Sequence, residues 1–211
     1  MNRVKEIELM EELIRRWEAL PPVVDDDFPS AHHLVRGSII RLAEHVTGRN
    51  LSSFSIHPHR EIGQKCNVYV ASSWRNKYQQ DVVNVLREAG HEVYDFKNPK
   101  EGDKGFHWSQ IDKDWEQWDI YDYGRALISE LAEQGYYQDW DAMNWADTFV
   151  LVQPCGRSAH LELGWAVGAG KRTALYYPEQ IEPELMVKMC DYMSDDLRKI
   201  IRWVNGESLI Y

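Results

Sequence analysis

The sequence has little of several features that mark familiar functional classes. Its three cysteines, Cys66, Cys155 and Cys190, have no paired spacing, which argues against a disulfide framework and favours a reduced, cytoplasmic setting. Basic residues number 24 against 34 acidic ones, so the net charge of −10 argues against a nucleic-acid polymer or an anionic membrane as partner. No apolar run reaches the length of a membrane span, and the amino terminus lacks the apolar core of a signal peptide.

Recognisable metal-ligand spacing is also missing. The histidines and the acidic run at residues 25–27 follow no zinc or calcium pattern, and surface or capping roles explain them better. A glycine-rich nucleotide fingerprint is absent as well. We therefore expect no metal site.

Alternating strand and helix patterns begin at Cys66 and continue to the end of the chain. Short β-branched runs predict strands, and the amphipathic stretches between them predict helices, which together indicate a doubly wound α/β domain with a mostly parallel sheet. Residues 1–64 are predicted to form a helical segment and connector, and residues 65–211 the α/β domain. The apolar face of an amphipathic helix over residues 4–17 must cover the main domain, a sister subunit or another protein.

The stretch around residues 148–172 carries the strongest local signal. TFVLVQ (148–153) predicts a buried strand, Ser158 is a candidate cap for a helix over residues 159–169, and the next strand follows at Arg172. Glu162 is then expected in the first turn of that helix, where the helix dipole favours an ionised carboxylate. Because ligands bind at the carboxyl ends of parallel strands, Glu162 is a candidate nucleophile; helix-dipole complementation is the alternative interpretation.

Asp139 is the second candidate acid, and it lies shortly before the same strand. Its alternative interpretation is an amino-terminal cap of a short helix over residues 137–145. Two carboxylates that face one bond are the arrangement that glycosyl transfer needs, since one attacks the anomeric carbon and the other manages protons. A pair about 5 Å apart would imply retention of configuration.

Two strand-to-helix turns offer groups for an anion or a sugar. The first contains Ser72, Ser73 and Arg75, and the second Arg157 and Ser158. An ordinary polar turn, with Ser73 as a helix cap, is the competing interpretation. The long polar and aromatic stretch 97–123 is typical of a functional loop, and its tryptophans either stack on a flat heterocycle or close a second core.

Three segments, in this order, resemble the nucleoside 2-deoxyribosyltransferase family, including its 2'-deoxynucleoside 5'-monophosphate N-hydrolase branch. VYVASSWRN (68–76) is similar to the family's first strand and substrate loop, and QDWDAMNWAD (138–147) to its aspartate helix. SAHLELGWAVGAGKR (158–172) is similar to its signature around the catalytic glutamate. The resemblance covers roughly residues 66–177 and implies a flavodoxin-like fold.

Carried over by position, the resemblance implies Glu162 as nucleophile at the sugar C1' and Asp139 as the acid that assists the leaving base or positions the sugar. Its substrate-binding positions are Tyr69, Ser73, Trp74, Arg75, Asn76, Gly156, Arg157 and Ser158. Arg75, at the phosphate-contacting position, favours a nucleotide. Many members place Asp or Ser six residues before the glutamate, where this chain has Gly156, so Arg157 or Ser158 is left to supply that polar group.

The sequence thus predicts an enzyme that cleaves or transfers the N-glycosidic bond of a nucleoside or nucleotide, and the resemblance implies a homodimer or higher homo-oligomer. No cofactor is expected, because the carboxylates carry both steps. Two alternatives stay open. One is an NAD-type glycohydrolase, as in distantly similar folds that use a glutamate. The other is a non-catalytic nucleotide-sensing module whose amino-terminal helices signal to a partner.

Overall fold

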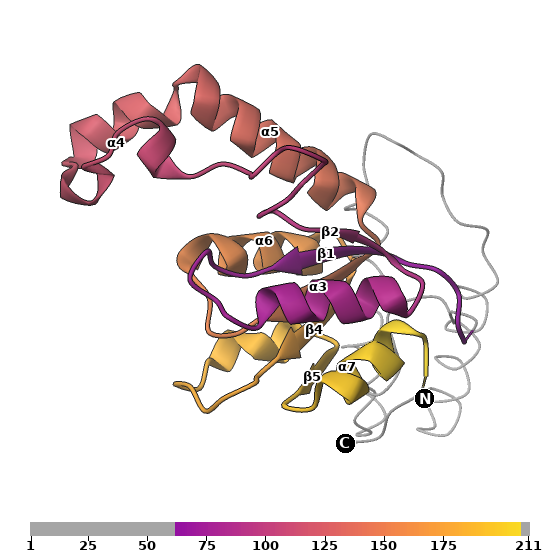
Figure 1. Ribbon diagram of the computed structural model, residues 1–211. Helices are drawn as coiled ribbons and strands as arrows, with labels where there is room; N and C mark the ends of the chain where they lie inside the picture. Colours follow the sequence, from indigo (N-terminus) through magenta and orange to yellow (C-terminus); the bar gives the residue numbers. More distant parts are fainter. Residues whose placement is uncertain (1–61, 208–211) are drawn as a thin grey trace, which may run out of the picture.

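The computed structural model describes residues 62–207, in which strands and helices alternate (Figure 1). The strands are β1 (Asn67–Ala71), β2 (Glu92–Tyr94), β3 (Thr148–Val152), β4 (Arg172–Tyr176) and β5 (Tyr192–Ser194). The α-helices of this part of the chain are α3 (Gln79–Glu88), α4 (Ile120–Leu127), α5 (Glu130–Trp145), α6 (Arg157–Gly168) and α7 (Leu197–Val204). Short 3-10 helices lie at Trp108–Gln110, Trp115–Gln117 and Leu185–Met189. The predicted alternation is confirmed.

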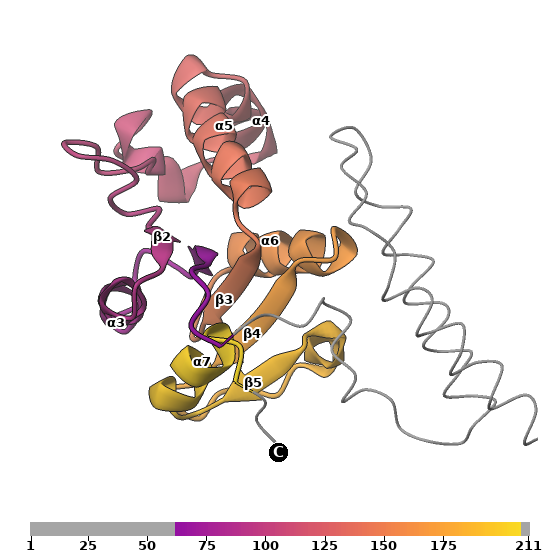
Figure 2. The same cartoon turned by 90° about the vertical axis from the view of Figure 1, so that its right-hand side faces the viewer.

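The strands form one parallel sheet in the order β2-β1-β3-β4-β5. All five residues of β3, the central strand, are buried, because helices cover both faces of the sheet. In Figure 1, α3 and α7 lie on one side of the sheet and α5 and α6 on the other, and the turned view in Figure 2 agrees. The structure therefore has the doubly wound α/β architecture expected from the sequence.

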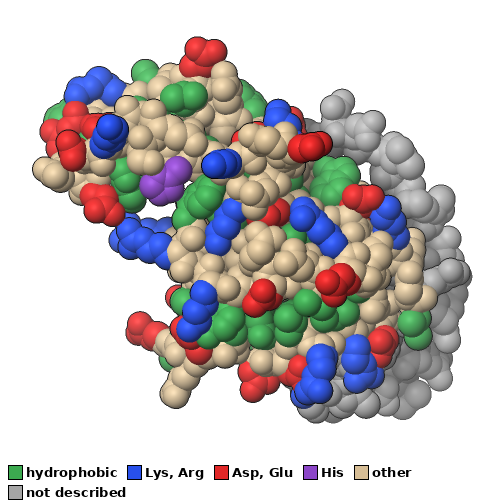
Figure 3. All heavy atoms as spheres, in the orientation of Figure 1, with side chains coloured by type: hydrophobic (Ala, Val, Ile, Leu, Met, Phe, Trp, Pro, Cys, Tyr) green, Lys and Arg blue, Asp and Glu red, His purple; other side chains and the backbone are tan. Residues whose placement is uncertain are grey.

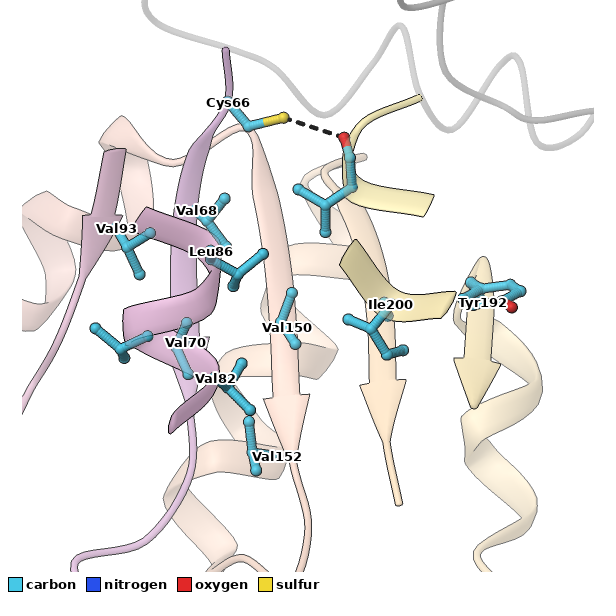
Figure 4. Close-up of a cluster of buried hydrophobic side chains, with 13 residues drawn as sticks. Cys66, Val68, Val70, Val82, Leu86, Val93, Val150, Val152, Tyr192 and Ile200 are labelled. Carbon is cyan, nitrogen blue, oxygen red and sulfur yellow. Dashed lines mark hydrogen bonds between the residues drawn. The ribbon is translucent and has the colours of Figure 1, made fainter. Parts of the chain in front are cut away.

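Each face of the sheet has its own hydrophobic core, and alternate strand residues point to opposite faces. The core under α3 and α7 is shown in Figure 4; it is made mainly of aliphatic side chains, including Val68, Val70, Val82, Leu86, Val150, Val152 and Ile200. The core under α5 and α6 mixes aromatic and small residues, including Tyr69, Met143, Ala146, Phe149, Leu151, Ala159 and Leu163. The candidate carboxylates belong to the two helices of this second face.

The boundaries of the helices differ from prediction in the α4–α5 region. We expected a separate short helix over residues 137–145, but α5 is continuous from Glu130 and the break falls at Ser129. The Ser129 hydroxyl donates to the Ala126 carbonyl and accepts from the Ala132 amide, so one side chain ends α4 and caps α5. The interpretation of Asp139 as a helix cap is wrong, because this residue lies in the interior of α5.

The start of α6 also differs from prediction. Gly156 is its N-cap residue and Arg157 its first helical residue, so Ser158 does not cap the helix. Glu162 consequently lies in the second turn rather than the first, where the dipole has less influence. No side chain caps this helix terminus.

Residues 97–119, called the aromatic segment below, connect β2 to α4 and pack against α5. The side chain of Phe106 fills the space above Gly135, a buried glycine of α5, and Trp108 contacts Phe106, Trp118 and Tyr123. Trp108 and Trp118 thus pack against neighbouring aromatic rings, and the stacking of tryptophans on a flat heterocycle stays a prediction.

Gly135 should tolerate no side chain. A Cβ there would lie 2.5 Å from the Phe106 Cβ, so Gly135→Ala should displace Phe106 and destabilise the fold by about 1–3 kcal/mol. Gly124→Ala in α4 is the matched control, since a Cβ there meets nothing within 4 Å and alanine favours the helix by about 0.5–1 kcal/mol. Chemical denaturation measures both. Equal stability of the two variants would contradict this packing.

The amino-terminal helix predicted for residues 4–17 and its connector lie outside the described residues and stay predictions. Within residues 62–207, none of the helices combines the length and apolarity required to cross a membrane.

Candidate active site

A row of three aromatic rings forms the base of the candidate site. Tyr69 of β1 pairs in register with Tyr94 of β2 on one side and with Phe149 of β3 on the other. The Tyr69 ring stacks on both neighbours, with ring centroids 5.3 Å from Tyr94 and 4.9 Å from Phe149. Because residues in register share a face, the sheet presents two tyrosines side by side to α5 and α6.

Glu162 of α6 is paired with the first of these tyrosines. The Tyr69 hydroxyl lies beside its carboxyl group and favours the ionised form, but burial and the nearby charge of Asp139 outweigh this effect and raise the pKa of Glu162 to about 8. Burial therefore favours the protonated form of Glu162 near neutral pH, whereas its place near the start of a helix predicted an ionised carboxylate. Glu162 is partly exposed, so a ligand can reach it.

Asp139 of α5 is paired with the second tyrosine. The Tyr94 hydroxyl donates to Asp139 Oδ1 at 2.7 Å, and burial nevertheless raises the pKa of Asp139 to about 6. The two carboxyl groups interact electrostatically although they come from different helices. Two acids with separated proton affinities can hold one proton between them near neutral pH, as a paired acid and base require.

Lysine and glutamine side chains fix α5 in this position. Lys171, which follows α6, donates to the carbonyls of Asn144 and Ala146 at the end of α5. Gln138, beside Asp139, donates to Asp103 of the aromatic segment at 2.8 Å. Hydrogen bonds thereby hold the helix that carries Asp139 both to Lys171, between α6 and β4, and to the aromatic segment.

The two turns that carry the predicted substrate-binding residues are joined by Asn76. The NH2 group of its side chain donates to the main-chain carbonyls of Val152 and Pro154, and its side-chain Oδ1 accepts from the Tyr78 and Gln79 amides at the start of α3. Asn76 is buried, and its polar atoms are used by the main chain. In this structure it positions both turns, and the cap that Ser73 was considered for is supplied by Asn76.

The remaining predicted residues lie at the same edge of the sheet. Gly156 faces Ser73 across the two turns, because a Cβ on the glycine would lie 4.0 Å from the Ser73 Cβ. Arg157 and Ser158 are exposed at the uncapped start of α6, where backbone N–H groups are available to an anion. The absent acid at position 156 thus leaves open space rather than a replacement side chain.

Trp74 and Arg75 contact the aromatic segment. Trp74, 38% exposed, meets Phe96 and His107 edge to face, and Arg75 forms an ion pair with Glu116 at 3.1 Å. Figure 3 shows the surface hollowed on the side toward which β1 runs, with basic side chains at its margin.

Sequence reasoning missed Tyr94 and Asp103. Tyr94 ends a strand whose register places it next to Tyr69, so its position at a strand carboxyl end was the available signal. Asp103 lies in the aromatic segment, whose conformation no periodic pattern encodes. Its charge raises the pKa of Tyr94, which places it near the carboxylate pair.

Cys155 lies beside a histidine, but burial disfavours the thiolate that a nucleophile needs. Its Sγ lies 3.5 Å from His160 Nδ1, yet burial, reinforced by Glu162 and Glu184, raises its pKa to about 12. The thiol therefore stays protonated near neutral pH. Among the described residues no group of histidine, cysteine and acidic side chains is arranged to hold a metal ion.

The comparisons with known proteins found similarity in the fold and none in the sequence searches. No protein-family model matches the sequence, and no curated protein matches it significantly. The structure is similar to a 2-deoxyribosyltransferase from the psychrotolerant bacterium Bacillus psychrosaccharolyticus, at 19% identity and a TM-score of 0.43 over 64% of this chain and 89% of that one. It is also similar to a CMP N-glycosidase from Clostridium botulinum, at 18% identity and a TM-score of 0.39 over 65% of this chain and 97% of that one. At these values the likeness assigns no activity.

Proposed function

We propose that this protein cleaves or transfers the N-glycosidic bond of a nucleoside or nucleoside 5'-monophosphate. The observation that carries the proposal is the pair of electrostatically coupled carboxyl groups, Glu162 and Asp139, each beside its own tyrosine at one edge of a parallel sheet. Glycosyl transfer needs such a pair, and the resemblance of three sequence segments to nucleoside 2-deoxyribosyltransferases assigns the same two residues.

Glu162 attacks the anomeric carbon of the sugar, the bond from that carbon to the base nitrogen breaks, and a glycosyl ester on Glu162 results. Asp139 in its protonated form donates its proton to the departing base. In the second step Asp139 removes a proton from water, or from a second base, as that group attacks the anomeric carbon and frees Glu162. The tyrosine hydroxyls of Tyr69 and Tyr94 orient the two carboxyl groups throughout. Both steps proceed without a cofactor.

Substrate binding is assigned to the two turns that Asn76 joins. Ser73, Trp74 and Arg75 lie on the first turn. Gly156, Arg157 and Ser158 lie on the second, where the uncapped start of α6 suits the 5'-phosphate of a nucleotide. The open space at Gly156 leaves room for the sugar. We further propose a cytoplasmic homo-oligomer; several large apolar side chains on α4 and α5 are exposed, as a subunit interface would require, among them Ile120, Tyr121, Leu127, Tyr136 and Tyr137.

Product analysis tests the proposal. The full-length protein is incubated with 2'-deoxynucleosides, ribonucleosides, their 5'-monophosphates and NAD, with and without an added free base, and released bases are quantified by chromatography. We expect release of a base, lost in Glu162→Ala and retained in Glu182→Ala, which removes an exposed carboxylate. A new nucleoside formed from the added base identifies a transferase, and its absence a hydrolase.

Two outcomes would overturn the proposal. Release of nicotinamide from NAD alone would favour the glycohydrolase. Tight binding of a nucleotide without turnover, unchanged in Glu162→Gln, would favour the sensing module.

A further inference from the structure

The aromatic segment contacts Arg75, the predicted phosphate-binding residue, and its neighbour Trp74 through two layers of contacts, one of rings and one of charges. In the first layer, the His107 ring lies between two tryptophans, with ring centroids 5.7 Å from Trp74 and 5.6 Å from Trp115, both edge to face. In the second layer, the residues that follow these tryptophans, Arg75 and Glu116, form the ion pair.

The ring contacts make the ion pair more favourable than an isolated surface pair. Exposed pairs contribute little, largely because two long side chains lose conformational freedom when they meet. Here each charged residue directly follows a tryptophan that already touches His107, so the two backbone positions are brought together before the charges pair. The Arg75 and Glu116 side chains are nevertheless 83% and 65% exposed, so a ligand can displace one from the other.

We propose that Glu116 is a specificity-determining residue that competes with the substrate phosphate for Arg75. This inference rests on the proposed function, in which Arg75 contacts a 5'-phosphate. A carboxylate is an anion that a guanidinium binds in the same bidentate geometry as a phosphate. A nucleoside 5'-monophosphate must break the Arg75–Glu116 pair to reach Arg75, whereas an unphosphorylated nucleoside leaves it intact. Glu116 therefore lowers the affinity for phosphorylated substrates only.

The test measures binding rather than turnover, so it does not depend on the chemistry of Glu162. Isothermal titration calorimetry is performed on Glu162→Ala protein with each 2'-deoxynucleoside and its 5'-monophosphate. Adding Glu116→Gln should tighten monophosphate binding about two- to five-fold and leave nucleoside binding unchanged. The gain should be larger at low ionic strength, because both side chains are exposed.

Two controls separate this effect from a general change in charge. Asp114→Asn removes a carboxylate from the same segment two residues away, and it should leave both affinities unchanged. In an Arg75→Ala background, Glu116→Gln should give no gain, since the competition needs the guanidinium.

Three results would overturn the proposal: an equal gain from Asp114→Asn, a gain that survives Arg75→Ala, or no monophosphate binding by either the Glu116→Gln protein or its parent. A different result would separate the two proposals. If wild-type protein releases no base in the product analysis but the calorimetric difference is present, the proposed N-glycosidic reaction is rejected and the role of Glu116 is retained.

Discussion

Replacing Glu162 with glutamine should abolish base release, by at least about 10³-fold, while making the protein more stable. The activity falls because an amide cannot attack the anomeric carbon. The stability rises because Glu162 is ionised in the unfolded chain above its ordinary pKa of 4.5, whereas the folded protein raises that pKa to about 8. Keeping this group neutral costs on the order of 3 kcal/mol at pH 7, a cost that the neutral amide does not have.

The sign of the effect fixes its pH dependence. Below pH 4.5 both states bind the proton and the penalty vanishes; between pH 4.5 and 8 it grows with pH, and above pH 8 it is constant. Thermal unfolding of wild type and Glu162→Gln from pH 5 to 9 should therefore show a widening difference in Tm. Glu182→Gln, an exposed substitution, should show none. A variant that is less stable than wild type at every pH would contradict the burial of this carboxyl group.

The dependence of kcat/KM on pH should be bell-shaped, with limbs near pH 6 and pH 8. In the proposed mechanism attack requires ionised Glu162 and departure of the base requires protonated Asp139, so the productive form carries one proton on the pair. Near neutral pH that proton lies mainly on Glu162, whose pKa is the higher of the two, and the productive form is the minority with the proton on Asp139. Below about pH 6 both groups are protonated and Glu162 cannot attack, and above about pH 8 neither group has a proton to donate. Activity should fall about tenfold per pH unit on either side. A plateau above pH 8 would rule out Asp139 as the acid.

Tyr94→Phe identifies the group responsible for the lower limb. The Tyr94 hydroxyl favours ionised Asp139, so its removal should raise the pKa of Asp139 and move the acidic limb to higher pH. Tyr137→Phe removes an exposed hydroxyl two residues from Asp139 on the same helix and should leave the profile unchanged. An unmoved limb in Tyr94→Phe would show that another group titrates there.

Strand positions and the parallel sheet could be predicted from the sequence because they depend on short apolar runs between turn residues. The bounds of β3 and β4 differ by a residue from those expected, since their buried positions leave little freedom. The helix boundaries were less predictable. Both Gly156 and Ser158 suit an N-cap, and a difference of two residues moved Glu162 from the first turn of α6 to the second.

The site itself was predictable only in part. Glu162, Asp139 and the two turns were identified from their places beside strand ends and from the family resemblance. The contacts of residues 97–119 could not be predicted, because they depend on tertiary packing such as Phe106 above Gly135. For the same reason, the pairing of Arg75 with Glu116 and the proximity of Asp103 to Tyr94 have no signature in the sequence.

The stacked Tyr69 and Tyr94 rings connect the two candidate acids to neighbouring strands of the sheet. Neighbouring strands are held about 4.8 Å apart by their backbone hydrogen bonds, and the Tyr69 and Tyr94 rings keep a matching separation of 5.3 Å. The Tyr94 hydroxyl is bonded to Asp139 and the Tyr69 hydroxyl lies beside Glu162, so the partners of the two acids stand on adjacent strands and not on a loop. We therefore expect that changes in the surrounding loops can alter which ligand enters without displacing the two tyrosines on which the acids rest.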